Sequence, residues 1–190
     1  MSAMSAMRDP LRDLFFSGQN ADGPRFTLPP GLPDPEPVNA VERRLFGVNT
    51  GLGIIIQAAK IKSYAGAFGL ANMTPPVLLA PFNFRGDQGD AYAACYWGSL
   101  LGKFLGLQTA RAYVLAHEAF QRGQSATEQR QDVFNMLFGI DRVFRLAPPG
   151  LNLDLRGGGA DLNNSLAGRS VLAAQRRQLR FQGPGVAPSM

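Results

Sequence analysis

The residues that could do chemistry gather in one part of this chain, residues 89–122. This part contains the only His, the only Trp and the only Cys of the sequence, His117, Trp97 and Cys95. Glu118 follows His117 directly, and an imidazole beside a carboxylate is a pairing that general acid–base catalysis uses. An Ala-rich helical hairpin that only forms a core explains the same residues more simply. Residue types alone therefore predict no mechanism.

The spacing of these residues predicts two helices with a break near Gly106. The first helix places four residues on one face through the offsets i, i+4, i+7 and i+11: Asp90, Ala94, Trp97 and Leu101. The second helix repeats the pattern with Ala110, Val114, His117 and Gln121.

A second carboxylate, Asp87, lies three residues before Asp90 at the start of the first helix. Both can act as capping residues that the helix dipole stabilises. Alternatively, both belong to a site at this helix end. The spacing is compatible with either role.

The charge balance favours an anionic partner. The formal net charge is +5 and the pI is about 9.9, almost wholly from arginine. Such a balance suits nucleic acid, anionic lipid or an acidic inhibitor protein. The basic residues are scattered and do not alternate with aromatics, so nucleic-acid binding is not indicated.

Cysteine and histidine counts limit metal chemistry. One Cys excludes an internal disulfide, and one Cys with one His cannot build a tetrahedral zinc site. We assign no metal site and expect no cofactor. An oxygen-ligand site for Mg²⁺ or Ca²⁺ has no support in the pattern.

The N-terminus lacks the basic and apolar regions of a signal peptide, and no run of about 18 apolar residues is present. We expect a protein made in the cytoplasm that does not span a membrane. If it acts outside the cell, it would leave through a specialised secretion system.

The composition divides the chain into an irregular Pro/Gly-rich arm (1–37), one helical domain (38–180) and a tail (181–190). Residues 24–37 contain six prolines, which exclude helix and favour an extended chain. This segment is either a wrapping arm or a PxxP ligand. The predicted fold class is mainly α, a compact helical domain with an irregular arm and tail.

Two further patterns predict helices before the hairpin. Asn39 with Glu42 is a weak capping pair at the start of the domain. Thr50 caps a helix over 50–66, although the three consecutive isoleucines within it could instead start a strand. Residues 67–88 then form a loop.

After the hairpin, Ser125 and Glu128 form a capping box that starts a helix through Phe144. Asp161 caps a last helix that runs through Arg180. Its closing arginines would favour the helix dipole.

The domain contains three short motifs, one after another along the chain. GDAYAACYW supplies Asp90, Ala91 and Trp97, and LGLQTARAYVLAHE supplies Gly106, Ala112, His117 and Glu118. A third motif, D-x-x-N-x-x-x-G, has two candidates. One is Asp132, Asn135 and Gly139; the other is Asp161, Asn164, Gly168 and Arg169.

Together these motifs resemble a helical domain at the C-termini of polymorphic, Rhs-type bacterial toxins, whose pattern is D-A-x-R-H-A-x-W, then H-E, then D-x-x-N-x-x-x-G-R. The resemblance covers about residues 85–142, and extends to 170 if the second candidate is used. The chain departs from it at one place, because Ala93-Ala94 stand where the family has Arg-His. Either a natural lineage lost the chemistry, or the chain is an engineered inactive copy.

The resemblance implies an antibacterial effector that is a hydrolase in its competent form. His117 would be the acid/base and Glu118 its orienter or a second carboxylate. Asp90 and Asp132 would position the site, and Asn135 would donate a hydrogen bond to substrate. The implied substrate-binding residues are Asp87, Trp97, Asp161, Asn164 and Arg169. An immunity protein is the implied partner.

The alternative is a non-catalytic structural or adaptor component of a large assembly, such as a phage-like particle or a secretion machine. In that case residues 24–37 and the C-terminal tail would contact neighbouring chains.

Overall fold

The computed structural model describes residues 50–71, 86–120, 124–154 and 162–181. In these ranges the chain is mainly α-helical and forms no β-strand, which confirms the predicted fold class. The α-helices are α3 (Thr50–Ala71), α4 (Gln88–Leu105), α5 (Leu107–Phe120), α6 (Ala126–Phe138) and α7 (Leu166–Gln175). A π-helix, η1 (Gly139–Phe144), continues α6, and a 3-10 helix, η2 (Leu162–Asn164), precedes α7.

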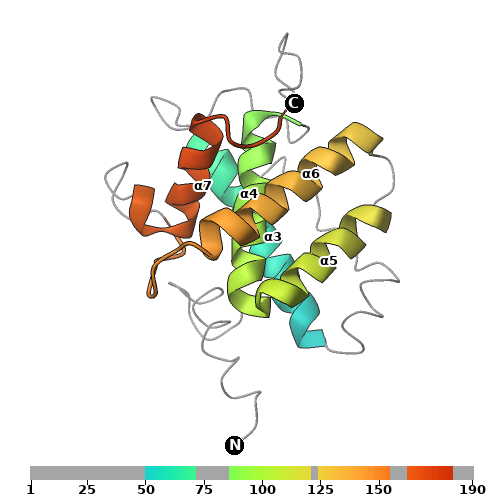
Figure 1. Ribbon diagram of the computed structural model, residues 1–190, viewed down its shortest axis with the longest axis horizontal. Coiled ribbons are helices and arrows are strands. Elements are labelled where there is room, and N and C mark those ends of the chain that lie inside the picture. Colours follow the sequence, from blue (N-terminus) through green and yellow to red (C-terminus); the bar gives the residue numbers. More distant parts are fainter. Residues whose placement is uncertain (1–49, 72–85, 121–123, 155–161, 182–190) are drawn as a thin grey trace, which may run out of the picture.

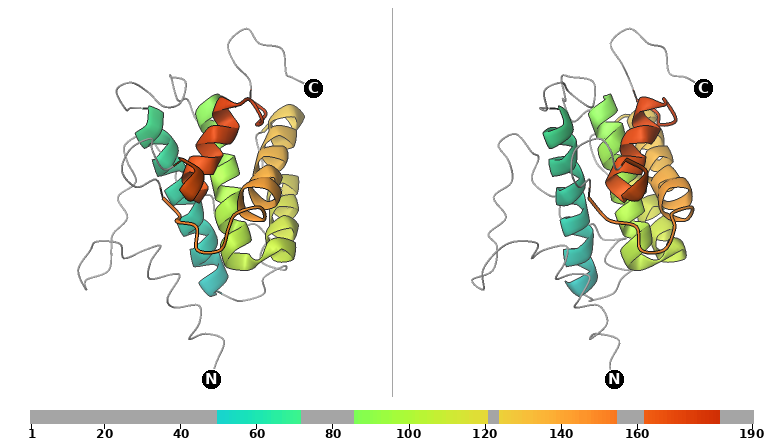
Figure 2. Two further views of the ribbon diagram at one scale, coloured as in Figure 1. Left: turned by 60° about the vertical axis from the view of Figure 1, so that its left-hand side comes forward. Right: turned by 90° about the vertical axis from the view of Figure 1, so that its left-hand side faces the viewer.

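The helix α4 is the centre of the arrangement. It packs against α3 on one side and against α5, α6, η1 and α7 elsewhere (Figures 1 and 2). Every residue from Gln88 to Gly102 is buried. Small residues alternate there with Tyr92, Tyr96 and Trp97, a composition that suits a helix enclosed on all sides.

Two glycines let the backbone of α4 contact the backbone at the end of α6. A Cβ on Gly98 would lie 2.1 Å from the carbonyl oxygen of Met136, and a Cβ on Gly139 would lie 1.9 Å from that of Cys95. Real Cβ contacts are never this close, so any side chain at either position would push the two helices apart.

The helix ends confirm three local predictions. The Asp87 side chain accepts a hydrogen bond from Asp90 N at 2.8 Å and caps α4. Gly106, with φ 79°, separates α4 from α5 at the predicted break. The capping box of Ser125 and Glu128 starts α6 as expected.

Other boundaries correct the sequence-based expectations. The segment that begins at Thr50 is helical throughout, so the isoleucine run is not a strand. α3 ends at Ala71 rather than at 66, which shortens the predicted loop. Beyond α6 the chain changes to a π-helix, so the predicted single helix through Phe144 is not uniform.

The last helix is shorter than expected. Its N-cap is Ser165, whose hydroxyl accepts from Gly168 N at 2.9 Å, and it ends at Gln175. The predicted run to Arg180 was therefore wrong, and the predicted cap, Asp161, lies outside the described residues. The predicted arm (1–37), the helix from Asn39 and the tail beyond 181 also lie outside them.

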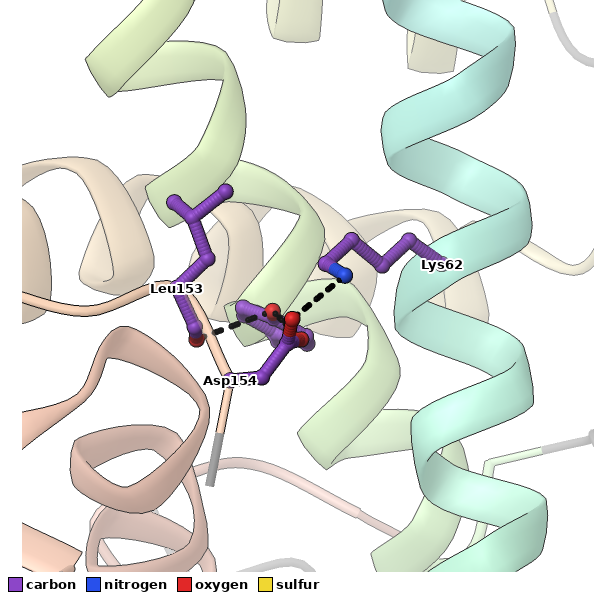
Figure 3. A network of polar contacts seen from close by, with 4 residues as sticks. Lys62, Leu153 and Asp154 are labelled. Carbon is purple, nitrogen blue, oxygen red and sulfur yellow. Dashed lines mark hydrogen bonds and ion pairs between the residues drawn. The ribbon is translucent and has the colours of Figure 1, made fainter. Parts of the chain in front are cut away.

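A polar network ties α3 to the segment 151–154 (Figure 3). Lys62 Nζ lies 2.7 Å from Asp154 Oδ2, and the Tyr96 hydroxyl lies 3.0 Å from both Asp154 Oδ1 and the carbonyl oxygen of Leu153. An isolated parallel bridge joins Asn152 to Ser165. The segment is thus held between α3, α4 and the start of α7.

A search of the described residues finds no helix with the length and apolar character needed to cross a membrane.

Candidate functional site

Asp90 is a buried carboxylate in the first turn of α4. Its Oδ2 accepts from Gly86 N at 2.8 Å, and its Oδ1 accepts from the Tyr64 hydroxyl at 3.2 Å. Burial raises the pKa of Asp90 from 3.8 to about 6, helped by the Asp87 charge and opposed by the two hydrogen bonds and by Lys60. This carboxyl therefore changes its charge near neutral pH.

Asp132, on α6, is the second perturbed carboxyl. Gln124 Nε2 donates to its Oδ2 at 3.1 Å. The pKa of Asp132 is raised to about 7, mainly by burial and also by the negative charge of Asp90, whereas the Gln124 hydrogen bond and Lys60 lower it. The negative charge of Asp90 therefore acts on Asp132 across α4 and α6, so the titration of Asp132 depends on the charge of Asp90.

Tyr64, on α3, brings a third carboxyl into the same group. Burial raises the pKa of its hydroxyl well above 10.0, and the charges of Asp90, Asp132 and Glu118 add to the effect. All three carboxylates thus act on one phenol. Tyr64 stays a neutral hydrogen-bond donor at any physiological pH.

His117, on α5, lies in an aromatic group. Its ring is stacked on Tyr113 with centroids 5.6 Å apart and meets the edge of Trp97 at 5.1 Å. His117 Nδ1 lies 3.5 Å from the Tyr113 hydroxyl, and His117 Nε2 lies 4.0 Å from Glu118 Oε1. The imidazole is thus held by rings on one side and a carboxylate on the other.

Lys60, on α3, connects the aromatic group to the acidic one. Its Nζ lies 5.1 Å from the Trp97 ring centroid, a cation–π contact. Its positive charge also lowers the pKa values of Asp90 and Asp132. We call the whole group the carboxyl cluster: Lys60, Tyr64, Asp90, Trp97, His117, Glu118 and Asp132.

The carboxyl cluster is nearly enclosed. Asp90 and His117 are each 7% exposed, and Glu118 is 4% exposed. The indole Nε1 of Trp97 is buried and has no hydrogen-bond acceptor among the described residues. It is therefore a donor that a bound group could use.

Five of the predicted site residues meet in this cluster: Asp90, Trp97, His117, Glu118 and Asp132. Asn135 is not one of them, because its side-chain amide binds the backbone of Arg180. Its Nδ2 donates to the carbonyl of Arg180 at 2.7 Å, and its Oδ1 accepts from Arg180 N at 2.8 Å.

The remaining predicted residues lie elsewhere. Asp87 is the cap of α4. Asn164 is exposed in η2, and Arg169 donates to the carbonyl of Leu146 at 3.3 Å. Asp161 lies outside the described residues. The motif at Asp132 and Asn135, rather than the one at Asp161, is thus the one next to the His117 helix.

Lys60 and Tyr64 were missed in the sequence. Both lie on α3, which precedes the toxin-like motifs, and they reach the cluster only through the packing of α3 on α4. One signal was available: four residues apart, they share a helical face.

Ala93 and Ala94 are buried, with 0% and 4% exposure. Ala94 lies between Asp90 and Trp97 on one face of α4, so a His there would face the cluster. Arg and His in place of these methyl groups would overpack the present core. Lys60 is the cation that this chain places beside the carboxylates instead.

Two other chemistries lack support in the part of the chain that the structure describes. No group of three or more His, Cys, Asp or Glu is arranged there to hold a metal ion. The Cys95 thiol is buried 3.7 Å from Ser170 Oγ, and burial raises its pKa to about 12, so it is not an activated nucleophile.

Comparison of the chain with protein-family models, with curated proteins and with solved structures found no match.

Proposed function

We propose that this chain is a toxin-type effector domain that acts as a hydrolase, with the carboxyl cluster as its acid–base centre. The observation that carries the proposal is a pair of carboxyls, the buried Asp90 and the half-buried Asp132, whose pKa values are raised to about 6 and about 7. Carboxyls tuned in this way are suited to proton transfer at neutral pH.

The two carboxyls take different roles. Asp132, with the higher pKa, is half-protonated at neutral pH and donates a proton to the leaving group. Asp90, with the lower pKa, is mainly ionised and accepts a proton from the attacking water. His117 and Glu118, on α5, supply a second pair of acid–base groups, an imidazole and a carboxylate.

The local charge of the cluster defines the substrate class. Three carboxyls meet a single lysine, Lys60, so a strongly anionic group would be repelled there. We propose a neutral or cationic group at the scissile bond, with the Trp97 indole N–H as a donor to it. This differs from the anionic substrate that the overall charge of +5 suggests. The basic surface suits an acidic immunity protein better.

The alternative function, a structural or adaptor component of a large assembly, has one observation in its favour. Asp90, His117 and Glu118 are buried, as expected if they only support packing, whereas Lys60, Tyr64 and Asp132 are half-buried. Under the hydrolase proposal, a substrate reaches them only after helices or flanking segments move.

Growth of bacteria that express the chain tests the proposal. The protein is directed in turn to the cytoplasm and to the periplasm, as the chain stands and as Asp132→Asn and His117→Gln. Arg142→Gln, at an exposed arginine outside the cluster, is the control. We expect growth arrest in one compartment for the unmodified chain and the control, and none for the two cluster variants.

Equal growth of all four proteins in both compartments would contradict a hydrolase that is active in this chain as it stands, with Ala93-Ala94 in place of Arg-His, and would favour the assembly function. Capture of a specific partner chain that depends on residues 24–37 would then support that alternative directly.

A further inference from the structure

A pocket separate from the carboxyl cluster opens where α4 ends, α5 begins and η1 ends. Its volume is about 330 Å³, at the lower end of the range for small-molecule sites. The apolar part of its lining comes from Leu107, Phe144, Pro149, Leu151 and Leu166. None of these belongs to the cluster.

Two cations, Lys103 and Arg145, stand in the lining of this pocket, and no carboxylate does. Lys103 Nζ reaches only the carbonyl oxygen of Leu151, at 3.5 Å, and both cations are exposed. No ion pair joins either of them to an acidic side chain of the described residues. Asp141, the acidic residue of η1, pairs with Arg111 instead.

The π-helix η1 shapes one wall. Its wider turn is seen in the bond from Arg145 N to the carbonyl oxygen of Ile140, at 3.0 Å. Such turns are rare and are frequently found at functional sites. Gly102 adapts α4 to this wall, because a Cβ there would lie 2.7 Å from Cδ1 of the Phe144 ring.

We propose that this pocket binds a small amphipathic anion, a carboxylate with a short aliphatic body. The aliphatic body would lie against Leu107, Phe144 and Leu151, and the carboxylate would lie between Lys103 and Arg145. The charge complementarity carries the assignment: an apolar floor beside two cations, with no acidic side chain in the lining, favours this ligand class over neutral or cationic ones.

Calorimetric titration of the full chain with octanoate and with octanol tests the proposal, because the two probes differ mainly in charge. We expect octanoate to bind saturably at one site per chain. The double variant Lys103→Gln, Arg145→Gln should weaken octanoate binding about tenfold, as two charge contacts are lost. Octanol should bind both proteins equally. Arg142→Gln, at an exposed arginine of η1 outside the lining, should leave octanoate binding unchanged.

The proposal would be overturned if octanoate binding does not saturate. It would also be overturned if octanoate binds the double variant as tightly as the unmodified chain. A second readout needs no variant: on octanoate titration, methyl NMR signals of Leu107 and Leu151 should shift while those of Leu115, exposed on α5, should not. Binding of the protein to phosphatidylglycerol vesicles tests whether the natural ligand is a membrane surface rather than a free anion. Vesicle binding that depends on both cations, without octanoate binding, would contradict the pocket.

Discussion

Asp90 and Asp132 are the residues in which burial changes the chemistry most. Enclosure raises both pKa values toward neutrality, and the negative charge of Asp90 adds to the rise at Asp132. A proton held near pH 7 is useful for catalysis, but a carboxyl that ionises in an enclosed site also destabilises the fold. The same side chains should therefore affect both activity and stability.

The first prediction concerns the pH dependence of stability. The unfolded chain releases these protons near pH 4, whereas the folded chain keeps them to about pH 6 and 7. The folded state thus binds more protons between pH 4 and 7, so the free energy of unfolding should fall as the pH rises through this window. Asp132→Asn should remove part of this fall and raise stability at pH 8 by on the order of 2 kcal/mol. Thermal melts at pH 4.5 and pH 8 measure both effects.

The control for that experiment is Asp154→Asn, because Asp154 is exposed and lies outside the cluster. It should change the pH dependence of the melting temperature little. If Asp132→Asn instead lowers stability equally at both pH values, the carboxyl is ionised in the folded protein and the raised pKa is wrong.

Part of the residue-scale site was visible in the sequence. His117 and Glu118 are neighbours in the chain, and Asp90 and Trp97 share a helical face through their spacing alone. The partnership of Asp90 with Tyr64 was not visible, because 26 positions separate them and only the packing of α3 on α4 joins them. The hydrogen bonds from Asn135 to Arg180 are also long-range contacts that no local pattern indicates.

At the scale of elements, the crossing of α4 with α6 and η1 sets the geometry of the cluster. This crossing brings the helix of Asp90 next to that of Asp132, and it depends on Gly98 and Gly139 at the contact.

The second prediction tests this crossing. Gly98→Ala should lower the free energy of unfolding by more than about 3 kcal/mol, because the new methyl group meets the backbone of Met136. Gly69→Ala is the matched control: it lies in a helix with no atom within 4 Å of its added Cβ. The control should be neutral or stabilise by up to about 1 kcal/mol. Urea unfolding measures the free energy of unfolding of both variants. Equal stability of Gly98→Ala and Gly69→Ala would contradict the close crossing.

The third prediction concerns how the chain after α7 is held on α6. Asn135→Ala removes two hydrogen bonds to the backbone of Arg180 and should cost about 1–3 kcal/mol of stability. The variant should retain the growth phenotype if it still folds, since the amide serves the backbone. Loss of activity without loss of stability would instead support the substrate-binding role that the motif implies.

Most helix boundaries with a local cause were predictable, and those with a tertiary cause were not. The Asp87 cap, the Gly106 break and the Ser125 capping box each involve residues close in sequence. The change of α6 into a π-helix coincides with the close contact of Gly139 with α4. The Ser165 cap of α7 is local but was missed, because Asp161 offered the same kind of cap four residues earlier.

At the scale of the whole molecule, the helices that the structure describes form a single group around α4. The proposed active centre and the proposed anion pocket lie in different parts of this group. Ligand in the pocket therefore does not need to enter the acid–base site.

The fourth prediction concerns the domain boundaries derived from the sequence. A chain limited to residues 38–181 should fold with one cooperative thermal transition and with the helical circular dichroism of the full chain, because the core contacts are within it. A non-cooperative melt of this fragment, beside a cooperative melt of the full chain, would show that the arm or tail is part of the folding unit.

The most direct test of the carboxyl cluster is a titration of the Asp90 and Asp132 carboxyl carbons by NMR, with Asp90→Asn and Asp132→Asn used to assign the signals. We expect two transitions with pKa values of about 6 and about 7, the higher one falling when Asp90 is replaced. Two transitions near pH 4, each unaffected by the other substitution, would contradict a coupled, buried acid–base pair and with it the proposed hydrolase centre.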